Sequence, residues 1–261
     1  MASNLSTIGF AFANEDEFRN TMIACAANAS ANLDCTGGTY GIWRSRTGAE
    51  IWFHLGKAAG GEVEIFGLTP FFDGASDVTL QITAPVKRAG DNAFEGAFHA
   101  WMTTADGAEQ LYPLVFDAID FAAHPNAAWP ALARARLCGF ARELASFPGE
   151  DSYYAARTGG DSPQLSSKAF IPIGLFASEK TGATGTGSNA QAPASTALLT
   201  GRVVEYRRLT NEATGSPFEW LLVETLDATI DIVADPAAVS GVIAEGGTIE
   251  ATVLLFGRLT G

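Results

Sequence analysis

Two histidines and two glutamates could form a metal site, because we expect them on neighbouring strands. His54 shares one face of its predicted strand with Glu50, and His99 shares one face of another with Glu95. Antiparallel pairing of these strands would bring the histidines together, and either glutamate would complete a two-histidine, one-carboxylate site. No spacing such as HxH or HExxH commits them to a metal. Two strand histidines that hydrogen-bond or face solvent are the alternative, and the sequence leaves it open.

Tryptophans stand two residues away from both histidines, at Trp52 and Trp101. Indole rings can stack against sugars or bases, so Trp52, His54, His99 and Trp101 are the candidate ligand-binding residues of the N-terminal sheet. Packing of the same aromatic side chains in the core is the alternative interpretation.

Motifs for nucleotide binding and nucleophilic catalysis lack their structural context. The segment Thr181–Gly187 reads TGATGTG, but the residues after it show no apolar periodicity and include Pro193, so we expect no phosphate-binding helix there. Cys25 and Cys138 are predicted on apolar helix faces, which leaves Cys35 as the only candidate for a reactive thiol. The sequence also contains no G-x-S-x-G motif. We therefore predict no cofactor, assign no catalytic residue and favour a binding protein over an enzyme.

The chain is strongly acidic, with a net charge of −13 over 261 residues. Residues 1–164 contain 10 basic and 19 acidic residues, and residues 199–261 contain 4 and 9. Both halves would repel a phosphate backbone or an anionic membrane surface, so the charge disfavours nucleic-acid and membrane partners. Three cysteines without CxxC spacing, an amino terminus without a signal-peptide pattern and the lack of a long apolar run predict a cytoplasmic protein with reduced thiols.

The N-terminal half is predicted to be an antiparallel β-meander with two flanking helices. Asn14 should cap the first helix, Glu15–Ser30, whose first turn is acidic. Apolar side chains recur at helical spacing from Ala133 to Leu144, which predicts a second helix over Ala131–Ser146. Short loops without crossover helices argue against a parallel sheet. The strands expected between the helices are Thr39–Ser45, Ala49–Leu55, Glu62–Leu68, Val78–Arg88, Phe94–Thr104 and Gln110–Ile119.

The C-terminal part is predicted to be an OB-like five-stranded β-barrel. Both faces of Phe218–Val223 are apolar, which predicts burial against the barrel core on one side and the partner domain or another subunit on the other. Residues 178–197 lack large apolar side chains, so we expect a flexible loop. The expected elements are the strands Lys168–Ala177 and Arg202–Leu209, the apolar ribbon Phe218–Ala234, a short helical stretch at Pro236–Ala244 and the strand Thr248–Leu259.

These features predict an α+β fold with one domain over residues 1–150 and a barrel domain over residues 165–261. A high apolar fraction of 47% with 17% charged residues, and the lack of a supported catalytic motif, favour a non-catalytic binding or assembly module that homo-oligomerises. The alternative is a small-molecule-binding protein or a metal-dependent enzyme, with its site on the N-terminal sheet face at His54, His99 and Glu50 or Glu95.

Overall fold

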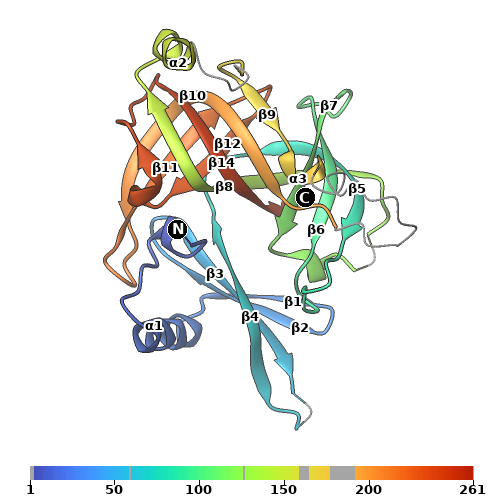
Figure 1. Cartoon of the computed structure of the whole chain (residues 1–261). Helices are drawn as coiled ribbons and strands as arrows, with labels where there is room; N and C mark the ends of the chain where they lie inside the picture. The colour runs from blue at the N-terminus through green and yellow to red at the C-terminus, as the bar shows by residue number, and fades with distance from the viewer. Residues whose placement is uncertain (1–2, 59, 126, 159–164, 177–191, 261) are drawn as a thin grey trace, which may run out of the picture.

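A computed structural model describes residues 3–58, 60–125, 127–158, 165–176 and 192–260 of the chain. Strands dominate these described residues and form a small sheet and a large one (Figure 1). The helices are short and lie outside the sheets. They are α1 (Glu15–Ala27), α2 (Glu150–Arg157) and α3 (Ile173–Phe176), with the 3-10 turns η1 (Ser6–Ile8), η2 (Phe121–Ala123) and η4 (Pro236–Ala238).

The small sheet is an antiparallel meander of four described strands in the order β1-β2-β3-β4. Its strands are β1 (Ala31–Cys35), β2 (Gly38–Arg44), β3 (Ala49–Lys57) and β4 (Val63–Phe72). Helix α1 precedes it and confirms the first predicted helix, because the Asn14 side chain accepts a hydrogen bond from the Glu17 backbone at 2.9 Å. The sequence did not predict β1.

The large sheet contains the remaining described strands from both halves of the chain. They are β5 (Val78–Val86), β6 (Ala97–Thr103), β7 (Gln110–Ala118), β8 (Ala131–Phe147), β9 (Ala169–Ile171), β10 (Thr196–Thr210), β11 (Pro217–Glu224), β12 (Thr229–Ala234), β13 (Val239–Ser240) and β14 (Thr248–Leu259). The predicted boundary between residues 150 and 165 falls between β8 and β9, so strands from both sides of it share this sheet. The predicted loop 178–197 falls mostly outside the described residues, and β10 already begins at Thr196.

Two closed circuits of hydrogen-bonded strands share the antiparallel pair β8 and β14, which we call the β8–β14 ribbon. The C-terminal circuit runs β8–β14–β10–β11–β12 and returns to β8 through a parallel pairing. The N-terminal circuit runs β8–β5–β6–β7–β14 and closes through a parallel pairing of β7 with β14. The six strands predicted as one meander therefore divide between two sheets, since β5–β7 belong to the large one.

The second predicted helix, Ala131–Ser146, is wrong, because these residues form the long strand β8. Alanine, leucine, arginine and glutamate favour helix locally, but pairing along both edges of β8 outweighs that preference. The side chains of the same residues alternate between the two faces of the strand. Ala135 and Leu137 point into the core, whereas Arg134 and Arg136 point outward to acidic partners.

The strand assigned to Lys168–Ala177 is also wrong as the missing barrel strand. Among the described residues of that range, 168–176, the structure has only the three-residue strand β9, paired to β10, and the short helix α3. The strand β8 completes the C-terminal circuit instead. The sequence could not indicate this, because β8 lies on the other side of the predicted domain boundary.

Two cores follow from this arrangement. One fills the interiors of both circuits and includes Leu137, Leu221 and Val253. The other lies between the small sheet and the outer face of the circuits, where Phe218 and Trp220 of β11 pack against Phe72. The two-sided burial predicted for β11 is therefore confirmed, and the second side is covered by the N-terminal sheet of the same chain.

Asp231 joins the two sheets at the link between β4 and β5. Its buried carboxylate accepts hydrogen bonds from the Ser76 backbone at 2.7 Å, the Ala75 backbone at 3.1 Å and the Trp220 indole at 2.8 Å. A side chain at Gly74 would clash, because a Cβ there would lie 2.3 Å from the same carboxylate. Burial raises the pKa of Asp231, and these donors oppose the rise.

We expect Asp231→Ala to lower the free energy of unfolding by about 3 kcal/mol, because three donors, two of them in buried hydrogen bonds, lose their acceptor together. The matched control is Asp235→Ala, which removes one solvent-exposed hydrogen bond to the Ala237 backbone and should cost about 1 kcal/mol or less. Urea unfolding followed by tryptophan fluorescence measures both. Equal losses in the two variants would contradict the role of Asp231 as the joint.

Candidate functional site

His54, the centre of the predicted metal site, is fully engaged by its neighbours. Its Nδ1 lies 3.2 Å from the Asn92 amide nitrogen and its Nε2 lies 3.1 Å from the Thr69 hydroxyl. Because an amide nitrogen can only donate, Nδ1 accepts, so Nε2 carries the proton and donates to Thr69. The imidazole also stacks on Phe94, with ring centroids 5.2 Å apart.

Burial lowers the pKa of His54 to about 4, so the ring is neutral at physiological pH. Glu95 Oε1 lies 4.0 Å from Nδ1, so the structure brings one predicted carboxylate close to this histidine. The network leaves no free lone pair on His54, and a metal would have to displace Asn92.

The other predicted site residues are divided between the two sheets. Glu50 is buried and accepts a hydrogen bond from the Trp52 indole at 2.7 Å and another from Arg44, so this pair belongs to the core of the small sheet. His99 and Trp101 are half-buried on β6, on the face opposite the inward Phe98 and Ala100. No group of three His, Cys, Asp or Glu side chains able to hold a metal occurs in the described part of the chain. The metal site stays a prediction, and elemental analysis of the purified protein would test it.

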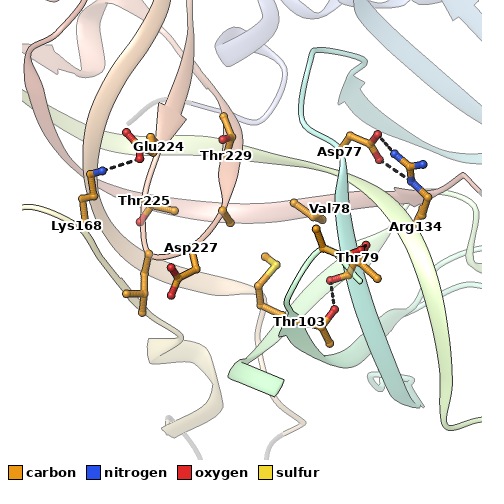
Figure 2. Close-up of a pocket in the computed structure, with 14 residues that line it drawn as sticks. Asp77, Val78, Thr79, Thr103, Arg134, Lys168, Glu224, Thr225, Asp227 and Thr229 are labelled. Atoms are coloured by element: carbon orange, nitrogen blue, oxygen red, sulfur yellow. Dashed lines mark hydrogen bonds and ion pairs between the residues drawn. The ribbon is translucent and has the colours of Figure 1, made fainter. Parts of the chain in front are cut away.

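A cavity of about 580 Å³ lies between the turn that joins β11 to β12 and the start of β5 (Figure 2). An ion pair lies on each side of the cavity in Figure 2. Lys168 Nζ is 2.6 Å from Glu224 on the left, and Arg134 pairs with Asp77 on the right. These charges largely compensate one another.

Four threonines give the cavity a polar lining, but three of their hydroxyls are already committed, among them that of Thr79, which donates to the Ala105 carbonyl at 3.2 Å. Thr103 donates to the Thr79 carbonyl at 2.9 Å, and Thr225 donates to the Thr200 carbonyl at 2.8 Å. The lining offers a small polar molecule few free donors, and no aromatic side chain on which a sugar ring could stack.

Asp227 is the distinctive residue of this cavity. It is exposed and has φ 50°, the left-handed region that side chains other than glycine rarely adopt. Burial and the nearby Asp227 charge both raise the pKa of Tyr112, whose buried hydroxyl has no hydrogen-bond partner among the described residues. This turn was not predicted, because the apolar residues of Phe218–Ala234 favour one continuous ribbon. Leu226 and Asp227 inside the apolar run were the available signal.

A second feature missed from the sequence is the end of the β3–β4 hairpin, which we call the arm and define as residues 55–58 and 60–66. Figure 1 shows it projecting at the bottom of the picture, away from the large sheet. Val63, Ile65 and Phe66 are 68%, 53% and 50% exposed. The alternation of glutamates with Val63 and Ile65 is typical of a strand with one buried face. Neither face is buried here, because α1 and the two circuits cover only the other end of the sheet.

We expect the stability of the protein to fall on acidification partly through His54. Its pKa is depressed in the folded state, so its contribution is complete above about pH 6.5 and is lost as the pH falls toward 4. Between pH 7 and pH 5 the wild type should lose about 2 kcal/mol more than His54→Gln, a difference in which the other titrating groups cancel. Urea unfolding at both pH values measures it. The control His99→Gln removes a half-buried ring and should keep most of the wild-type pH dependence, whereas identical behaviour of wild type and His54→Gln would contradict the assignment.

Comparisons of the chain with models of known protein families, with characterised proteins and with solved structures found no match in any of the three. Within the described residues, no helix combines the length and apolarity that crossing a membrane requires.

Proposed function

We propose that this protein is a binding and assembly module that forms a homodimer by pairing the free edges of β4. The observation that carries the proposal is the cluster of three exposed apolar side chains, Val63, Ile65 and Phe66, on the edge strand of the small sheet. Nine large hydrophobic side chains are exposed among the described residues, and only these three are adjacent on one strand. Exposed apolar clusters of this kind are typical of interaction surfaces.

The edge of β4 is open because no described strand pairs with it on the side opposite β3. An unpaired edge presents N–H and C=O groups in a row that matches another strand. Natural proteins usually protect such an edge with proline or charge. Here Pro70 protects the buried half of β4, and Glu64 is the only charged residue of its exposed half, Val63–Phe66.

A second copy of this chain fits the edge through a two-fold antiparallel pairing. If the axis passes beside Ile65, the Ile65 side chains of the two copies face each other. Glu64 then lies opposite Phe66 of the second copy, and Val63 lies opposite its Gly67. This register pairs the Ile65 side chains of the two copies and places no glutamate opposite another glutamate.

Electrostatics set the conditions for such a dimer. Each copy carries a net charge of −13, so two copies repel each other at low ionic strength, and salt screens that repulsion. The apolar contacts of the arm do not depend on ion pairs, so the dimer is favoured at moderate salt. The same acidic charge disfavours nucleic acid as a partner.

The closed C-terminal circuit also supports an OB-like five-stranded barrel as the architecture of that half. Its support is the closed path of four antiparallel pairings and one parallel pairing. In this proposal the barrel is a rigid base on which the small sheet and its arm are mounted.

Sedimentation velocity over about 1 to 100 µM protein at moderate salt tests the proposal. The wild type should shift from monomer to dimer with concentration, whereas Ile65→Glu should stay monomeric, because two like charges would meet in the apolar contact. The matched control is Val242→Glu, which changes a residue that is 83% exposed outside the arm and should dimerise like the wild type. A wild-type monomer at every concentration, or equal loss of association in both variants, would contradict the proposal.

A further inference from the structure

A second, smaller cavity of about 300 Å³ lies beside η2 and has aromatic walls. We call it the His124 pocket, and its lining includes Thr36, Pro85, Phe98, Phe121, His124 and Trp129. Phe98 contacts all three other rings: the centroid distances are 5.3 Å to Phe121, 5.1 Å to Trp129 and 6.5 Å to His124. The pocket is mostly apolar with few polar groups, which is the composition of small-molecule sites.

The Phe121 wall of this pocket is held in place before any ligand arrives. The Lys87 ammonium lies 4.9 Å from the centroid of the Phe121 ring. The ring also lies over Gly96, where a Cβ would come within 2.6 Å of it. A wall fixed in this way loses little conformational freedom on binding.

The polar end of the pocket is a histidine that a buried carboxylate orients. His124 Nε2 lies 3.0 Å from Asp120 Oδ2, and the same oxygen accepts a hydrogen bond from the Leu259 backbone at 3.1 Å. Asp120 is buried, and its position is therefore fixed by the last strand of the sheet. Nδ1 of His124 has no hydrogen-bond partner within the described residues, so it is the atom left for a ligand.

The histidine at this end can supply a charged hydrogen-bond donor. The hydrogen bond to Asp120 raises the pKa of His124, against the opposing effect of burial, so the doubly protonated ring persists closer to neutral pH. In that form Nδ1 is a charged donor. No carboxylate lines the pocket, because Asp120 is turned toward His124 Nε2 and the Leu259 backbone.

We propose that the His124 pocket binds a small aromatic carboxylate. Its ring would pack among Phe98, Phe121 and Trp129, and its carboxylate would accept a hydrogen bond from His124 Nδ1. Aromatic walls favour a planar apolar ring, and a charge-assisted hydrogen bond favours a carboxylate over a neutral group of the same shape. Thr36 adds a neutral hydroxyl to the same lining.

Calorimetric titration of the full-length protein with benzoate and with benzamide tests this proposal, because the two probes have the same shape and only one carries a charge. We expect benzoate to bind roughly tenfold more tightly than benzamide. Equal affinities, or no benzoate binding at millimolar concentration, would overturn the proposal without the need for any variant.

Two substitutions locate the site. His124→Gln should weaken benzoate roughly tenfold and leave benzamide nearly unchanged, whereas Trp129→Leu should weaken both probes. The control is His99→Gln, which removes a histidine from β6 outside this pocket and should bind benzoate like the wild type. If His124→Gln leaves the affinity for benzoate unchanged, the His124–Asp120 pair only holds the end of β14 in place and does not bind a ligand.

Discussion

The structure depends on the antiparallel pairing of β8 with β14, because both closed circuits are built on this one ribbon. Each strand of the ribbon changes neighbours along its length: β8 passes from β5 to β12, and β14 passes from β10 to β7. Gly257 leaves room for a neighbouring side chain where β14 meets β7, since a Cβ there would lie 2.5 Å from the Phe116 ring.

The orientation of the small sheet is set by its packing on the strands of the two circuits. Its inner face packs on outward side chains of the circuits, including Phe140 and Phe256 of the ribbon and Phe218 of β11. The buried Asp231 carboxylate then fixes the link between the sheets. One end of the four-stranded sheet is thus covered by the large sheet, and the other end carries the arm into solvent. The edge of β4 is exposed at the arm because the second core covers only the other end of the small sheet.

Local signals predicted most of the individual strands of both sheets, but not how the strands of the large sheet pair. The cap at Asn14, the hairpin around Gly48 and the boundaries of β14 could be predicted because each depends on residues close in sequence. The strand β8 could not, because its alanines and arginines favour helix and its partners lie up to 124 residues away in the chain. For the sites, the sequence predicted that His54 and Glu95 could belong to one metal site, and His54 Nδ1 lies 4.0 Å from Glu95 Oε1. It could not indicate that Asn92 and Thr69 occupy both nitrogens of His54, nor that the alternating arm would be exposed on both faces.

In our proposal, a rigid frame built on the β8–β14 ribbon presents the free edge of β4 to a second copy. Hydrogen exchange measured residue by residue at low and high protein concentration tests this most directly, because strand pairing protects backbone amides. We expect protection at Val63–Phe66 to rise with concentration, while the slow exchange of β8 and β14 stays unchanged. Protection of the arm that is independent of concentration, or a concentration effect on another segment, would contradict the account.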